Sequence, residues 1–154
     1  MSAAQKKSRS GNARSAARLA AVQALYQREM SGQPLAALLA EFHAHRLGAE
    51  IEGVQFREAD VDFFNDLVAG VDARQAEIDD LVTANLAEGW ALDRLDRPMR
   101  QILRAGAYEL LARADVPTSA IINEYVDVAH AFYDEREAKF ANALLDSAAR
   151  KVRG

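Results

Sequence analysis

Apolar residues recur at helical spacing from Ala13 onward, and this pattern constrains the fold more than any other feature of the sequence. No segment shows the alternating apolar and polar residues, with an Asn-Gly or Asp-Gly turn, that are typical of hairpin strands. We therefore predict an all-α fold of about six or seven helices. A chain of 154 residues is long enough for one domain with a hydrophobic core, or for two small helical halves packed together, and we expect a single domain at residues 13–154.

Caps and helix breakers set the expected helix boundaries. Asn12 and Asp60 are favourable N-caps, and Thr118 or Ser119 can cap a later helix. Proline suits the first turn of a helix, where its missing N–H is not needed. The predicted helices cover residues 12–30, 34–47, 60–82, 98–113, 118–132 and a last helix that contains Phe140 and the terminal bases up to Arg153.

Three segments interrupt this helical pattern. Residues 48–59 mix glycine, glutamate and isolated apolar residues without a period, so we expect a loop there. The long third helix is expected to kink or break near Gly70, and residues 134–137 are expected to form a charged loop. Trp90 is assigned to packing at the join between the halves.

Charge is distributed unevenly along the chain, although the net charge is only −4. Six bases precede the first acid, Glu29, whereas the other 13 bases are mixed with all 23 acids. Residues 1–12 carry no large apolar side chain besides Met1, so we predict a disordered basic arm. Such an arm suits the phosphates of a nucleic acid and suits an anionic membrane almost as well, and the alternative is a solubilising tail.

The sequence lacks the residue groups that most enzymes need. It has no cysteine, and its three histidines, His43, His45 and His130, lack the i, i+4 spacing of a helical metal site. It also lacks the glycine-rich nucleotide motifs and the Gly-x-Ser-x-Gly motif. We therefore expect a binding protein with no enzymatic activity, metal or cofactor. With no apolar run long enough for a membrane span and no signal peptide, we expect it in the cytoplasm.

Several short motifs, in order along the chain, resemble those of the NusB family of transcription antitermination factors. The first predicted helix contains Arg-Leu-Ala-Ala-Val-Gln-Ala-Leu-Tyr at residues 18–26, and the third contains a matching segment at 64–71. Each motif is weak alone, but their order and spacing together are specific. The later matches are Ile102–Arg104, Ala107–Leu110, Val116–Pro117, Ile122–Glu124, Lys139–Asn142 and Leu145–Asp146.

The resemblance covers about residues 13–150 and implies both a fold and a function. It implies a NusB-like helical bundle in two packed halves that binds the boxA element of nascent ribosomal RNA transcripts. It also implies a protein partner, the small-subunit ribosomal protein NusE, within an antitermination complex that helps RNA polymerase to resist termination. Because relatives of this family occur as monomers and as dimers, a homodimer stays open.

Single-stranded RNA is bound by cations along its phosphates and by aromatic rings that stack on its bases. The resemblance places the start of the last helix near the first helix, so that Lys139 and Phe140 can join the basic arm in one surface. Core packing is the alternative for Tyr26 and Phe140, and an ion pair with a nearby acid such as Glu109 or Asp96 is the alternative for Arg100 and Arg104. The candidate RNA-binding residues are Lys6, Lys7, Arg9, Arg14, Arg18, Tyr26, Arg100, Arg104, Lys139 and Phe140.

Two rival functions follow from the same pattern. The RNA-recognition domain of ribosomal RNA cytosine methyltransferases shares this fold, but no methyl-donor domain follows Gly154, so we expect the free-standing factor. The second rival is a helical protein-interaction module without any RNA role. Binding of NusE without any effect on RNA binding would favour that module.

Overall fold

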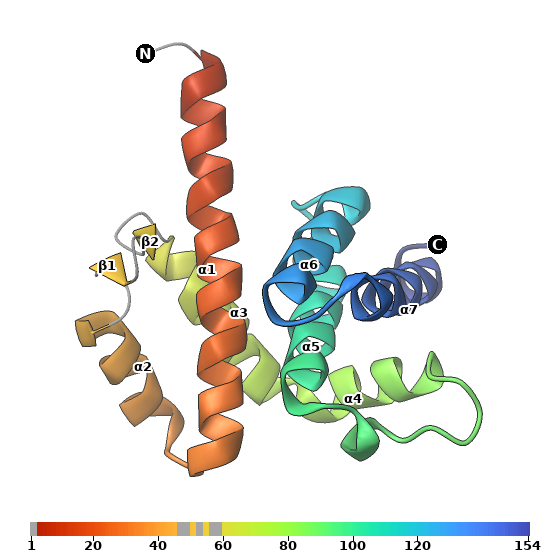
Figure 1. Cartoon of the computed structure of the whole chain (residues 1–154). Coiled ribbons are helices and arrows are strands. Elements are labelled where there is room, and N and C mark those ends of the chain that lie inside the picture. The colour runs from red at the N-terminus through yellow and green to blue at the C-terminus, as the bar shows by residue number, and fades with distance from the viewer. Residues whose placement is uncertain (1–2, 46–49, 52–53, 56–59) are drawn as a thin grey trace. The chain divides into compact units, whose positions relative to one another are not determined.

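The computed structural model describes residues 3–45, 50–51, 54–55 and 60–154, and in these residues the chain is helical apart from short connections and one small hairpin (Figure 1). They contain seven α-helices, which confirms the predicted all-α class. The chain divides into two compact units, Met1–Ala69 and Gly70–Gly154.

The first unit is built on a long helix, α1 (Ala3–Ser31), against which α2 (Leu35–His45) packs. Gly32, at a φ of +69°, allows the tight turn between the two helices. The first residues of α3 (Val61–Ala73) complete the core, in which the rings of Phe42 and Phe64 stack with centroids 5.6 Å apart. The apolar side chains of α1 that are buried in this core include Ala17, Ala21, Val22 and Leu25.

Two features of the first unit differ from the sequence prediction. Helix α1 begins at Ala3, whereas the sequence pattern suggested Asn12. The disorder of residues 1–12 as a free arm stays a prediction. Within the expected loop at 48–59, the described residues form two short antiparallel strands, β1 (Glu50–Ile51) and β2 (Val54–Gln55), and the rest of that loop lies outside the described residues.

The long third helix predicted from the sequence is two helices. Helix α3 ends at Ala73 and α4 (Gln75–Ala84) follows, so the break expected near Gly70 is present but lies four residues later, at Arg74. Gly70 has another role, because a Cβ atom there would lie 2.2 Å from the ring of Tyr108. Glycine at this position therefore permits close packing of α3 on a buried tyrosine.

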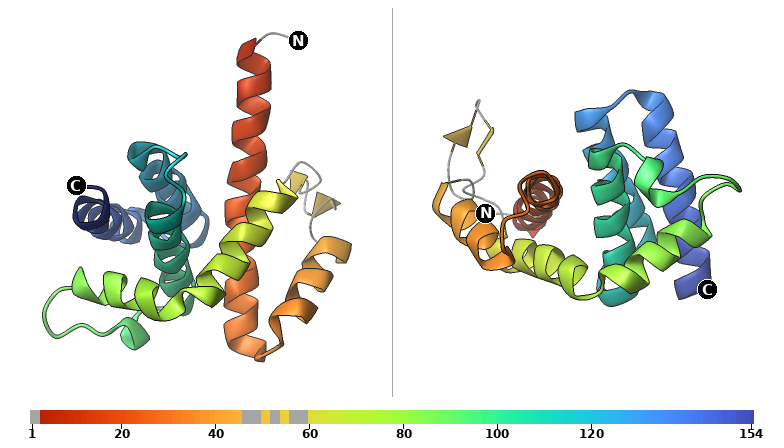
Figure 2. Two further views of the ribbon diagram at one scale, coloured as in Figure 1. Left: turned by 180° about the vertical axis from the view of Figure 1, so that it is seen from behind. Right: turned by 90° about the horizontal axis from the view of Figure 1, so that it is seen from below.

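The second unit is a bundle in which α5 (Arg97–Ala112), α6 (Thr118–Phe132) and α7 (Glu135–Arg153) pack side by side, with α4 against α5 (Figure 2). A short 3₁₀ helix, η2 (Leu92–Arg94), connects α4 to α5. Proline occupies the first turn of α5, as predicted. The core side chains buried between these helices include Ile102, Leu103, Ile121, Tyr125 and Leu145.

The starts of α6 and α7 correct two local predictions. Pro117 is the N-cap of α6, and within the described chain no side chain caps that end. The hydroxyl of Thr118 instead accepts a hydrogen bond from Arg153. The charged loop predicted at 134–137 is the first turn of α7, where Glu135 and Glu137 interact favourably with the helix dipole.

Candidate nucleic-acid interface

The basic arm predicted at the N-terminus belongs to the first turns of α1, where the structure places Lys6, Lys7 and Arg9. These three bases lie within four consecutive residues of the sequence, so positive charge is concentrated in this segment. This segment is therefore suited to electrostatic attraction of a polyanion, whatever its base sequence.

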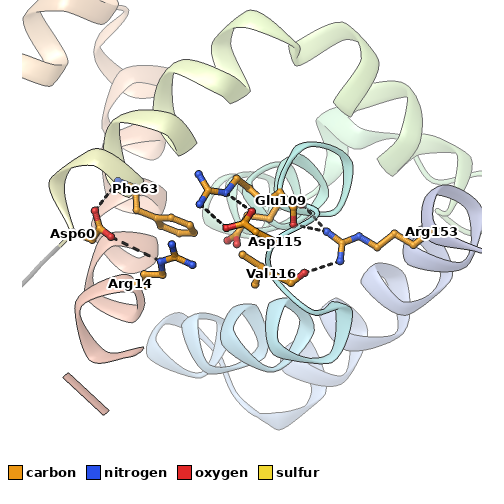
Figure 3. Close-up of polar contacts among 8 residues, drawn as sticks. Arg14, Asp60, Phe63, Glu109, Asp115, Val116 and Arg153 are labelled. Atoms are coloured by element: carbon orange, nitrogen blue, oxygen red, sulfur yellow. Dashed lines mark hydrogen bonds and ion pairs between the residues drawn. The ribbon is translucent and has the colours of Figure 1, made fainter. Parts of the chain in front are cut away.

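Arg14 and Arg18, one turn apart on α1, both contact the ring of Phe63 at the start of α3. Their guanidinium carbons lie 4.7 and 4.9 Å from the ring centroid, within the range of a cation–π interaction. Asp60 caps α3 by accepting a hydrogen bond from the Phe63 N–H, and its carboxylate lies 3.8 Å from Arg14 (Figure 3). The cluster thus joins the start of α3 to α1.

The two arginines of this cluster differ in their access to solvent. Arg18 is only 3% exposed, whereas about a third of the Arg14 side chain is exposed. A phosphate could approach Arg14 without a rearrangement of the helix. Arg18 is already buried against protein, so its position favours a role in holding Phe63.

Arg100 and Arg104 on α5 are engaged within the second unit. Arg104 forms two hydrogen bonds, of 2.8 and 3.0 Å, with the carboxylate of Asp79 on α4. The ion-pair alternative for Arg104 is therefore present, although its partner is Asp79 and neither Glu109 nor Asp96. Arg100 is 8% exposed and donates to the carbonyl of Leu92.

Lys139 and Phe140 lie on the outer face of α7, near its start. Ala138 and Ala141 on the same helix are buried, so the two residues between them point away from the core. Lys139 is exposed and has no ion pair or hydrogen bond among the residues that the structure describes. Phe140 is 38% exposed, which leaves part of its ring available for stacking. Tyr26, on α1, is partly exposed as well.

Phe140 also lines a cavity of about 460 Å³ within the second unit. Trp90, in the connection that follows α4, lines the same cavity and is 58% exposed. Two arginines, Arg94 and Arg136, belong to the lining too. Sequence reasoning missed these three residues, although a lone tryptophan in a polar segment after a glycine was a usable signal.

Tyr133 fixes the polar part of this cavity. Its hydroxyl donates a hydrogen bond to the carboxylate of Asp96 and accepts one, at 3.0 Å, from the N–H of Met99. Burial of the hydroxyl, and then its bond to Asp96, raise the pKa of Tyr133 well above its usual range. The phenol is therefore neutral at physiological pH and joins the start of α5 to the end of α6.

Over the residues described, the structure contains no group of three or more histidine or acidic side chains arranged to hold a metal ion. A separate search of the same residues finds no helix with the length and apolar character needed to cross a membrane.

Comparison with known proteins shows a consistent similarity. The profile of the NusB family matches residues 15–150. A transcription antitermination protein NusB of Novosphingobium aromaticivorans is 68% identical over 144 residues, which cover 94% of this chain and 97% of the relative. T. maritima NusB superposes with a TM-score of 0.73 at 30% identity, over 90% of this chain and 91% of that one.

A further solved structure contains antitermination factors NusB and NusE in complex with dsRNA. The matching chain superposes with a TM-score of 0.76 at 23% identity and covers 91% of this chain and 98% of that chain. At that identity, the likeness shows a shared fold.

Proposed function

Because this chain belongs to the NusB family, we propose that it is a transcription antitermination factor that binds boxA RNA of nascent ribosomal RNA transcripts. The observation that carries the proposal is the pair Lys139 and Phe140, an exposed cation next in sequence to an exposed ring on the solvent-facing side of α7. Single-stranded RNA is bound by this combination, since cations hold its phosphates and rings stack on its bases.

We propose a division of labour among the candidate residues. Lys6, Lys7 and Arg9 supply sequence-independent attraction, and Arg14 adds a cation that solvent reaches. Lys139 and Phe140 contact one phosphate and one base. Tyr26, partly exposed on α1, is a further candidate for stacking.

The buried arginines are proposed to position helices and not to contact RNA. Arg18 is held against Phe63, and Arg104 is held by Asp79. A phosphate contact by either would first break these interactions and would then have to compensate for their loss. The same argument applies to Arg100, whose guanidinium binds the Leu92 carbonyl.

The proposed protein partner is NusE, together with which the chain would support the processivity of RNA polymerase. Support for this partner is the complex of a fold relative with NusE and dsRNA, described above. The second unit has exposed polar and aromatic residues on α7 that can serve an interface of this kind.

The test is fluorescence anisotropy of a labelled boxA RNA and of a scrambled control, titrated with the protein at two salt concentrations, with and without NusE. Tighter binding of boxA RNA that NusE strengthens would support the proposal. Weak binding that is equal for both RNAs and lost at the higher salt would refute boxA recognition. Binding of NusE with no effect on RNA would instead favour a protein-interaction module.

Single substitutions can separate specific contacts from general charge. Lys139→Ala and Phe140→Ala should each weaken boxA binding, whereas Lys151→Ala, an exposed lysine near the other end of α7, is the matched control. Deletion of residues 1–12 should weaken binding of both RNAs at low salt. Unchanged affinity after the deletion would refute a role for the arm.

A further inference from the structure

A cavity of about 460 Å³ opens where the connection between α4 and α5 meets the start of α7, all within the second unit. Leu86, Leu95 and Met99 give it an apolar lining, and Trp90 and Phe140 contribute aromatic rings. Its volume lies within the range of about 300–1,000 Å³ that is usual for pockets that bind small organic groups.

The two aromatic rings are unusually accessible for their size. Trp90 is 58% exposed and Phe140 is 38% exposed, although burial of such rings would stabilise the fold. Exposed apolar surface that lines a cavity, with polar groups around it, is typical of a binding site. The exposed faces of these rings are suited to a flat, aromatic ligand.

Two cations and two carboxylates lie in the lining of the cavity, and the cations can bind an anion beside that ligand. Arg94 and Arg136 are exposed, and across the described residues neither guanidinium has an ion pair or a side-chain hydrogen bond. Of the two carboxylates in the lining, Asp96 accepts a hydrogen bond from Tyr133. Glu137 is in the lining as well and can accept a hydrogen bond from the edge of a base.

We propose that this cavity takes one unstacked base of a single-stranded RNA, with Trp90 and Phe140 stacking on the base and Arg94 and Arg136 binding the flanking phosphates. This inference rests on the proposed RNA-binding function and adds Trp90, Arg94 and Arg136 to it. A base within a duplex remains stacked on its neighbours, so the cavity selects single strands or unpaired positions. An apolar peptide would fill the cavity but leave both guanidinium groups without an anion.

The chain has a single tryptophan, which makes the proposal directly measurable in the unaltered protein. Trp90 fluorescence is recorded while an unlabelled single-stranded boxA RNA of about 12 nucleotides is added, and binding of the same RNA is followed by anisotropy with a label at one end. We expect quenching that saturates together with the anisotropy signal. A duplex of the same sequence should quench less.

Substitutions then identify the contacts. Trp90→Ala should weaken binding of the single strand about tenfold, whereas Trp90→Phe should retain most of the affinity because a ring remains. Arg136→Gln should weaken binding and lower the salt dependence, and Arg150→Gln, an exposed arginine farther along α7, is its charge-matched control. Thermal melting of each variant checks that its fold is intact.

An abasic series locates the base that enters the cavity. Each nucleotide of the RNA is made abasic in turn, and the loss of affinity is measured for the original protein and for Trp90→Ala. At one position, removal of the base should lower the affinity of the original protein. The same removal should lower the affinity of Trp90→Ala only slightly, because the ring on which the base stacks is already absent.

The possible failures are distinguishable. If no RNA changes the anisotropy, the proposed function fails and the cavity proposal fails with it. If RNA binds while Trp90 fluorescence and the affinity of Trp90→Ala stay unchanged, only the cavity proposal is wrong. If Trp90→Ala weakens binding of NusE and not of RNA, the cavity takes a protein and the proposal is likewise wrong.

Discussion

Arg153, near the end of α7, joins three parts of the second unit by hydrogen bonds that can be tested by substitution. Its guanidinium donates to the carbonyls of Glu109 and Leu110, in the last turn of α5, at 3.1 and 3.0 Å. It also donates to the carbonyls of Arg113 and Val116 in the following turn, at 2.8 and 2.7 Å (Figure 3). The Glu109 carbonyl also accepts the N–H of Arg113, and the Arg113 carbonyl that of Val116, so the guanidinium adds a second hydrogen bond to each. With its bond to Leu110 it acts as a C-terminal cap of α5.

The expected cost of Arg153→Ala can be worked out from these contacts. A hydrogen bond to a charged group contributes about 1.5–3 kcal/mol when it is buried, and a cation at a helix C-terminus adds about 0.3–1 kcal/mol. Arg153 is partly exposed, so water would replace some of the lost bonds. We therefore expect a loss of about 2 kcal/mol in the free energy of unfolding, which for a chain of this size lowers Tm by about 4–8 °C.

Differential scanning calorimetry of Arg153→Ala, with Arg150→Ala as the control, measures this cost. Arg150 is on the same helix, but its side chain is 77% exposed and pairs with Asp146 one turn away, so its removal should lower Tm by no more than about 2 °C. Arg153→Lys keeps the charge but not the planar fork, and should recover less than half of the loss. Equal Tm values for Arg153→Ala and Arg150→Ala would refute the capping role.

Three further changes test other parts of the structure. Gly70→Ala should lower the free energy of unfolding by about 1–3 kcal/mol, because the new methyl group would overlap the Tyr108 ring. Denaturant titration of the double variant Gly70→Ala/Tyr108→Ala should show that part of this loss is relieved. Because the pKa of Tyr133 is raised, the contribution of its phenol to stability is fully present below about pH 10 and is lost as the pH rises further. The urea midpoint should therefore fall less between about pH 9.5 and 11 in Tyr133→Phe than in the original protein. Equal falls in the two proteins would contradict this. Arg104→Gln should lower the free energy of unfolding by about 1 kcal/mol and leave RNA affinity unchanged, because the Arg104 guanidinium is already bound to Asp79. A loss of RNA affinity with an unchanged Tm would contradict this structural role of Arg104.

The helices could be predicted from the sequence because their signals are local. Apolar spacing identified every long helix, and Asp60 was correctly placed as the N-cap of α3. Failures came where a distant residue decides the local structure. Gly70 suggested a kink by its own low helix propensity, but in the structure it makes room for Tyr108, which is 38 positions away in a different helix.

The candidate site was harder to predict for the same reason. Periodicity shows which face of a helix is buried but not which side chain lies opposite, so the pairing of Arg104 with Asp79 could not be read from the sequence. The sequence likewise left undecided whether the Phe140 ring is exposed, since a ring within an apolar pattern usually packs in the core. Trp90 was assigned to packing because large rings are mostly buried, and only the structure reveals its exposure beside the cavity.

Existing bonds to protein groups divide the cations described above into two groups with different consequences for RNA binding. Arg18, Arg104 and Arg153 are held by protein groups, so binding a phosphate would cost them existing bonds. Lys139 is exposed and has no such bond within the described part of the chain, and the same holds for the two arginines of the cavity. A phosphate can therefore bind these residues in exchange only for water and counterions. Because affinity for single strands falls with salt by a slope of about 0.7 for each phosphate neutralised, the slope counts the accessible cations and not all the bases in the sequence.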